Sequence, residues 1–281
     1  MELTVLYSEI FRSIQGEGHY TGVPTAWLRF FGCNLECNGF GQENPKDPST
    51  YKLPYEQIDV TNITSVEELP VFKYGCDSSY SWSKKFAKIQ KKGTPEEVAE
   101  KLNSYMKGDQ WHVAFTGGEP MFKAAQKNQV AIMEHLNMPK SITIETNSTA
   151  PIFPELKEAQ LKYQKDLGTE FFYSCSPKMF SVSGEKDVVR PKVVKGYHDV
   201  SNKGQLKFVC NGTDESWDEI EDAIEQFRDH GITYPVWIMP VGALEETQKD
   251  NAAEIAEQTM DRGYNVSARV HCYIWGNQIG T

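Results

Sequence analysis

The chain has 281 residues, of which 39% are hydrophobic and 12% aromatic. This composition provides for a sizeable core and excludes intrinsic disorder, which goes with low hydrophobicity and few aromatic residues. The formal net charge of −10 argues against a broad nucleic-acid interface, because phosphates are bound by clustered lysine and arginine. No apolar run approaches the roughly 20 residues of a membrane span. The start, with Glu2, lacks a signal-peptide pattern, so we expect a cytoplasmic protein.

Strand-like and helix-like segments alternate along the chain. β-Branched, leucine and aromatic residues predict strands at 3–11 and 25–31. Thr94 and Glu97 form a capping box that predicts a helix beginning at Pro95. Further strands are predicted at 111–115, 141–145, 170–173, 206–210, 236–239 and 265–270, and further helices around 130–136, over 216–227 with a Ser216–Glu219 capping box, and over 247–261. This alternation predicts an α/β fold with a mainly parallel sheet.

Residues 38–75 interrupt that alternation. The segment is rich in proline, glycine and polar residues, which is typical of a surface loop. We therefore predict a single domain over residues 1–281 with an insertion at 38–75.

Two short motifs carry most of the chemical information. Three residues separate Cys33 from Cys37, a spacing that suits iron–sulfur ligands, although the pair alone is equally consistent with two unrelated loop thiols. TGGEP at 116–120 follows a predicted strand. Its glycines allow either a close ligand approach or a tight turn, and Glu119 offers an acceptor for a ligand ammonium group. We expect the remaining cysteines, Cys175, Cys210 and Cys272, to serve as small buried hydrophobic residues.

In this order, the cysteine loop and TGGEP resemble the radical S-adenosylmethionine (SAM) enzymes, and further motifs extend the resemblance to the family of 7-carboxy-7-deazaguanine synthases. The matching segments are EIFRSIQGEG (9–18), GxPxxWLRFFGCNLxC (22–37), CDSSY (76–80), FTGGEP (115–120), ETNST (145–149), SPK (176–178), LKFV (206–209), IMPVG (238–242) and RVHCYIWGNQIGT (269–281). One departure is the 38 residues between Cys37 and Cys76, where the family has Cys-x3-Cys-x2-Cys or an insertion between its first two cysteines. We choose Cys76 as the third ligand because Asp-Ser-Ser-Tyr after it resembles the family's Asp-Thr-x-Tyr.

The resemblance implies a radical SAM partial (β/α) barrel with three bound groups. A [4Fe–4S] cluster would be held by Cys33, Cys37 and Cys76, SAM would occupy the open iron, and Mg²⁺ would be held by Ser78. The implied activity is a carbon–nitrogen lyase that converts 6-carboxy-5,6,7,8-tetrahydropterin to 7-carboxy-7-deazaguanine with loss of ammonia, in queuosine-type 7-deazapurine biosynthesis. A reducing electron donor such as a flavodoxin and a homodimer are also implied, with no direct nucleic-acid or membrane partner.

The same resemblance assigns the binding residues. Those for the cofactor are Asp77, Gly118, Glu119, Asn147, Ser176, Pro177, Lys178, Met239, Pro240, Val241 and Gly242. Those for the substrate are Ile14, Gln15, Gly16, Glu17, Arg29, Thr116 and Thr281. Arg29 would pair with the substrate carboxylate, and strand alternation places it on the opposite face from Leu28 and Phe30. The alternative for Arg29 is a surface arginine, and His271 is expected to be a structural histidine.

Two other functions are considered: a non-catalytic iron–sulfur and SAM-binding regulatory protein, and a radical SAM activase of a partner protein. The activase lacks support because the chain has no additional cysteine-rich insert. The sequence does not distinguish tRNA from DNA modification as the use of the product, and it is silent on the purpose of the insertion.

Overall fold

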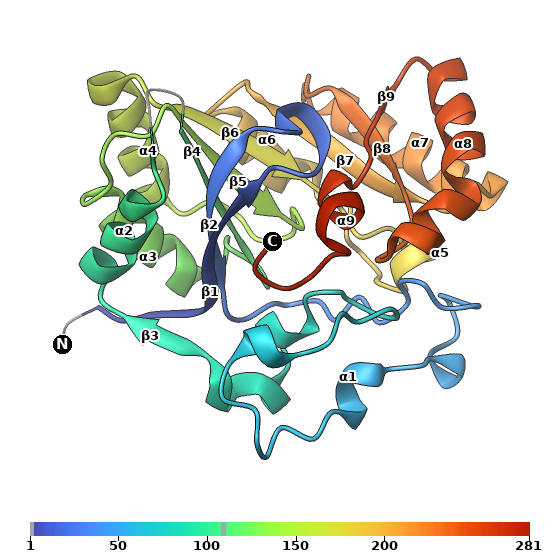
Figure 1. Cartoon of the computed structure of the whole chain (residues 1–281). Helices are drawn as coiled ribbons and strands as arrows, with labels where there is room; N and C mark the ends of the chain where they lie inside the picture. Colours follow the sequence, from blue (N-terminus) through green and yellow to red (C-terminus); the bar gives the residue numbers. More distant parts are fainter. Residues whose placement is uncertain (1–2, 108–110) are drawn as a thin grey trace.

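The computed structural model describes residues 3–107 and 111–281, so the start with Glu2 lies outside the described residues. Its centre is a nine-stranded sheet in the order β3-β1-β2-β4-β5-β6-β7-β8-β9 (Figure 1). The strands are β1 (Val5–Ile14), β2 (Pro24–Phe30), β3 (Lys91–Gly93), β4 (His112–Gly117), β5 (Ser141–Thr146), β6 (Glu170–Cys175), β7 (Gly204–Cys210), β8 (Val236–Pro240) and β9 (Asn265–Val266). β1 is antiparallel to β2 and β3, and every other neighbouring pair is parallel. The predicted mainly parallel sheet is confirmed.

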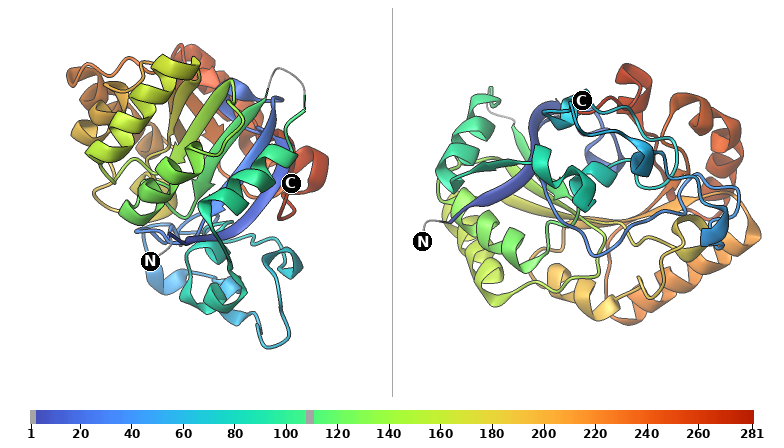
Figure 2. Two further views of the ribbon diagram at one scale, coloured as in Figure 1. Left: turned by 90° about the vertical axis from the view of Figure 1, so that its left-hand side faces the viewer. Right: turned by 90° about the horizontal axis from the view of Figure 1, so that it is seen from below.

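Most helices lie along one face of this curved sheet, as the two views of Figure 2 show. They are α1 (Pro54–Gln57), α2 (Pro95–Ser104), α3 (Lys123–Met133), α4 (Pro154–Leu167), α5 (Phe180–Ser183), α6 (Pro191–His198), α7 (Asp214–Asp229), α8 (Glu245–Asp261) and α9 (Val270–Trp275). Among the described residues β3 and β9 are the two edges, so the sheet is open. This is the partial (β/α) barrel that the sequence predicts. None of the helices described here is both long and apolar enough to cross a membrane.

The start of α2 confirms the predicted capping box. The Thr94 hydroxyl accepts from the Glu97 amide at 3.2 Å, and the Glu97 carboxylate accepts from the Thr94 amide at 2.8 Å. The predicted cap at Ser216 is wrong, because α7 begins earlier and the Thr213 hydroxyl accepts from the Ser216 amide. The Glu219 carboxylate instead accepts the backbone amides of residues 180 and 181 at the start of α5.

The predicted strand at 265–270 is also wrong beyond Val266. The Val270 amide donates to the Gly16 carbonyl, and the chain turns there into α9. Five other helices and strands of the described residues have no counterpart in the prediction: β3, α1, α4, α5 and α6. β3 consists of two lysines and a glycine that pair with β1 through the backbone, so no apolar pattern marks it.

The two faces of β2 separate the core from the inner side of the sheet. Leu28 and Phe30 are buried in the main hydrophobic core beneath the helices, whereas Arg29 points to the other face. On that inner face Trp27 stacks on Phe11 of β1, with ring centroids 5.8 Å apart. Alternation along the strand thus places a positive charge and a flat aromatic surface together.

Residues 38–75 lie along the bottom of the view in Figure 1, in light blue to cyan. Their buried apolar side chains form a second core with three residues that follow Cys76: Tyr55, Val66, Leu69 and Phe72, with Tyr80, Phe86 and Ile89. The expected surface loop is therefore a small packed unit. Its definition as an insertion in a single domain stays a prediction.

Candidate active site

A cavity of about 270 Å³ lies where the carboxyl ends of the parallel strands meet. Residues at or just beyond the ends of β2, β4, β5, β6 and β8 line it, as expected for ligands of open α/β sheets. Of the site residues predicted from the sequence, only Glu119 and Pro177 do not line this cavity. The fold thus brings together segments that span most of the chain.

Three cysteines from two separate segments share one part of the wall. Cys33 and Cys37 lie in the loop after β2, and Cys76 follows the segment 38–75. Burial, with further contributions from nearby negative groups, raises the pKa of Cys33 to about 12 and that of Cys76 to about 11. The Cys37 thiol is likewise raised well above its usual pKa, by burial first and then by Cys76. Lys178 offsets this only in part, so without a bound metal these groups are neutral thiols, and a bound metal would deprotonate them.

The surroundings of these thiols fit an iron–sulfur cluster. The Leu35 amide and the Asn147 side chain donate to Cys33 Sγ at 3.4 and 3.7 Å. Trp82 also lines the cavity, and its buried indole N–H faces the Cys76 thiol, whose pKa it lowers. Cluster sulfurs accept such N–H groups. The described residues hold no group of three His, Cys, Asp or Glu side chains suited to a single metal ion, whereas a four-iron cluster keeps its ligands farther apart.

The two glycines of TGGEP are needed for backbone packing. A Cβ on Gly117 would lie 2.4 Å from the Phe30 carbonyl oxygen, and one on Gly118 would lie 2.2 Å from that of Gly32. Gly117 also has φ +141°, which disfavours any other residue. The tight approach of β4 to the cysteine loop therefore accounts for both glycines, and Gly118 lines the cavity with its backbone.

Glu119 is turned into the protein. One oxygen of its carboxylate accepts from the Met121 amide at 2.8 Å and the Thr146 hydroxyl at 2.7 Å, and the other accepts from the Asn147 amide at 2.8 Å. Burial raises its pKa to about 7. The carboxylate orders the loop after β5, and its predicted contact with a ligand ammonium group stays a prediction.

Arg29 is held from two sides in the wall of the cavity. Its Nε donates to Glu9 at 2.7 Å, and its Nη1 donates to Ser78 Oγ at 3.1 Å. The side chain is 17% exposed, so it is not the surface arginine of the alternative reading. Nη2 has no acceptor among the described residues, so both of its N–H groups are left for a ligand.

Seven charged or titratable side chains of the wall were not predicted as site residues: Glu9, Lys73, Tyr80, Glu145, Lys207, Arg269 and His271. Glu145 accepts from the Gln15 amide group at 3.0 Å. Lys207 is a charged residue within the apolar strand β7, and that signal was visible in the sequence. His271 has no hydrogen bond to the described residues, and its Nδ1 would lie 1.9 Å from a Cβ on Gly16. The expectation of a structural histidine is therefore not supported.

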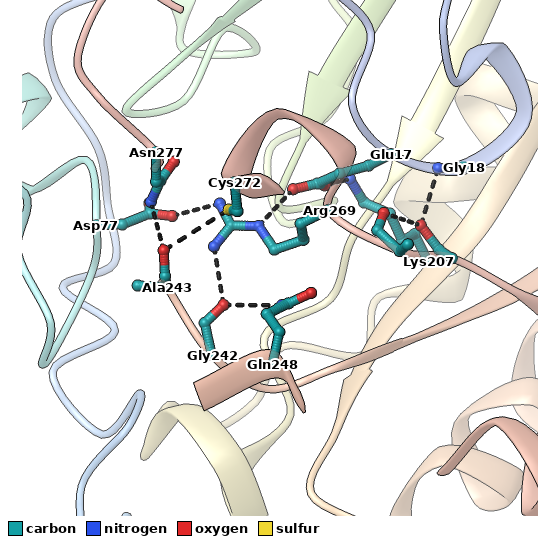
Figure 3. Close-up of polar contacts among 12 residues, drawn as sticks. Glu17, Gly18, Asp77, Lys207, Gly242, Ala243, Gln248, Arg269, Cys272 and Asn277 are labelled. Atoms are coloured by element: carbon teal, nitrogen blue, oxygen red, sulfur yellow. Dashed lines mark hydrogen bonds and ion pairs between the residues drawn. The ribbon is translucent and has the colours of Figure 1, made fainter. Parts of the chain in front are cut away.

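Lys207 and Arg269 meet Glu17 and Asp77 in one network, in which Asp77 is 30% exposed and the other three side chains are largely buried (Figure 3). Burial would raise the pKa of both carboxylates, but the neighbouring cations outweigh it. The pKa of Asp77 falls to about 2, and that of Glu17 lies well below its usual range. Both are ionised at neutral pH.

A curved parallel sheet with a three-thiol cavity at its strand ends defines the class. The model of the radical SAM superfamily matches residues 74–256, and the chain belongs to that superfamily. It is 25% identical to a 7-carboxy-7-deazaguanine synthase of Rhodopirellula baltica over 100% of this chain and 90% of the relative. It is 24% identical to the protein of that name in Halobacterium salinarum over 96% and 90%.

Among solved structures, the crystal structure of QueE from Escherichia coli matches with a TM-score of 0.54 and 18% identity, covering 95% of each chain. This match shows the same fold. Membership in the superfamily implies a [4Fe–4S] cluster and SAM as cofactors, and the thiols described above are suited to the cluster.

Proposed function

We propose that the chain is a 7-carboxy-7-deazaguanine synthase. It converts 6-carboxy-5,6,7,8-tetrahydropterin to 7-carboxy-7-deazaguanine and ammonia, a lyase step in which the atoms balance without an external oxidant. The observation that supports this most is one cavity lined by three thiols and by Arg29, whose guanidinium is only partly hydrogen-bonded. Relatives of that name also match the chain over nearly its full length. The cluster and SAM supply one-electron radical chemistry when bound.

The chain's own residues bind the substrate and the cofactors and orient them. Nη2 of Arg29 is available for the substrate carboxylate, and the stacked rings of Phe11 and Trp27 offer a flat apolar surface beside it for the pterin. Gln15, already bonded to Glu145, reaches the ring from the loop after β1. The thiols at the other part of the wall hold the cluster, and Asn147, Ser176 and Lys178 flank SAM.

Ser78 is proposed to hold Mg²⁺. Its hydroxyl accepts from Arg29 and donates to Asp77 Oδ1 at 3.2 Å. A hydroxyl oxygen has two lone pairs, so one remains for a hard cation. Mg²⁺ keeps several waters and requires only one or two protein ligands.

The test is anaerobic incubation of the reconstituted protein with SAM, Mg²⁺, a reductant and the carboxypterin. We expect 7-carboxy-7-deazaguanine and ammonia in equal amounts, with SAM not consumed. Cys76→Ala, which lacks a proposed cluster ligand, serves as the inactive control. A protein that holds the cluster and binds SAM yet yields no deazaguanine would contradict the proposal.

We further propose a cytoplasmic homodimer that receives electrons from a flavodoxin-like donor. α9 exposes three consecutive apolar side chains, Tyr273, Ile274 and Trp275, and such a patch is typical of an interface between copies. Light scattering should give a dimer mass for the wild type and a monomer for Ile274→Lys. A monomer mass for the wild type would refute the proposed dimer and would leave the proposed activity standing.

A further inference from the structure

Arg269 joins three segments that enclose the cavity. Its Nε donates to Glu17 at 2.9 Å, its Nη1 to the Gly242 carbonyl at 3.0 Å, and its Nη2 to Asp77 at 2.7 Å (Figure 3). Glu17 lies in the segment after β1 that faces the substrate. Asp77 stands between Cys76 and Ser78, and Gly242 ends the SAM segment after β8. One planar guanidinium therefore contacts three segments of the cavity wall that are far apart in the sequence.

The network around Arg269 is balanced in charge. Lys207 pairs with the second oxygen of Glu17, so two cations face two carboxylates. The side chains of Arg269 and Lys207 are only 11% and 6% exposed. Solvent therefore screens the two Glu17 pairs weakly, and it screens the pair with Asp77, which is 30% exposed, somewhat more. A displacement of one member is felt by the others.

We propose that Arg269 is a positioning residue that couples SAM binding to substrate binding. This inference rests on the proposed function. The rigid fork of a guanidinium satisfies three acceptors only when all three segments are in register. SAM bound against Gly242 fixes the fork, and the fork then holds Glu17 in place for the pterin. By linkage, the pterin raises the affinity for SAM by the same factor.

The experiment measures the dissociation constant of the carboxypterin with and without saturating SAM, on reconstituted holoenzyme without reductant, so that no turnover occurs. The variant is Arg269→Lys, which keeps the charge but cannot bond three acceptors. Arg262→Lys is the matched control, because Arg262 donates to Glu221 and the Gln258 carbonyl outside the cavity. Thermal midpoint and cluster absorbance are recorded for each protein.

In the wild type and in Arg262→Lys, SAM should tighten pterin binding about five-fold or more, a typical coupling between sites. In Arg269→Lys this ratio should fall below about two-fold, with thermal midpoint and cluster content equal to the control. The coupling is overturned if SAM tightens pterin binding as much in Arg269→Lys as in the wild type, or if SAM leaves pterin binding to the wild type unchanged. The proposed function stands in both cases. Loss of the cluster from Arg269→Lys also overturns it, because Arg269 would then act in assembly. A wild type that binds SAM but not the pterin overturns the proposed function itself.

Discussion

Replacement of Arg29 by methionine should affect stability and activity through two separable causes. The Glu9 side chain is only 2% exposed, and one of its oxygens accepts from both Arg29 and the Tyr80 hydroxyl, the latter at 2.6 Å. Its other oxygen is buried and has no partner among the described residues. Arg29→Met leaves the Glu9 carboxylate buried without its ion-pair partner. Breaking a buried ion pair by removing one partner costs about 3–5 kcal/mol, and the Tyr80 bond that remains favours the lower end.

For a chain of this size, about 3 kcal/mol corresponds to a fall in Tm of roughly 6–12 °C. Glu9→Gln in the same molecule removes the stranded charge and keeps an acceptor for Tyr80, so the double variant should recover at least half of that loss. The assay is thermal unfolding followed by circular dichroism, on the two single variants and the double variant. A double variant as unstable as Arg29→Met would refute the stranded charge as the cause.

Activity should not recover with stability. Loss of a charge-assisted contact to the substrate carboxylate is worth about 2 kcal/mol or more, or roughly 30-fold in kcat/KM for the carboxypterin. Arg29→Lys should rescue only partly, because it supplies the charge without the planar fork. A double variant with wild-type kcat/KM would mean that Arg29 has only a structural role.

Three further predictions concern the cluster, the cation and the pH dependence. Absorbance of the reconstituted [4Fe–4S] cluster should vanish when alanine replaces any of Cys33, Cys37 and Cys76. Cys210→Ala, which removes a buried thiol on β7 outside the cavity, should keep it. A full cluster in any of the first three variants would reject that cysteine as a ligand. Mg²⁺ should raise turnover of the wild type but not of Ser78→Ala, and equal stimulation of both would exclude Ser78 as a ligand. His112 is buried between the hydroxyls of Thr25 and Thr143, and burial lowers its pKa to about 4. The folded state then binds fewer protons than the unfolded state, so His112 should lower the free energy of unfolding by about 3 kcal/mol as the pH drops from about 6.5 to 4. Denaturant titrations of His112→Gln should show a fall smaller by that amount, and an equal fall in both proteins would reject His112 as its source.

The sequence by itself determined the features that depend on short-range geometry. The Thr94–Glu97 capping box is confirmed because its bonds close within one turn, and the strands of the parallel sheet are marked by apolar runs that are buried on both faces. Motif order was enough to place nearly all the predicted site residues in one cavity, since parallel strands have their carboxyl ends at one edge.

Only the tertiary structure decided which groups face one another. Arg269 and Asp77 are 192 positions apart, and no local pattern predicts that they form an ion pair. The carboxylate of Glu119 points away from the cavity because three donors from its own loop and from β5 satisfy it. α9 replaces the end of a predicted strand because Val270 meets the Gly16 carbonyl. Such contacts depend on the packing of distant segments, and a carboxylate turns toward whichever donors that packing supplies.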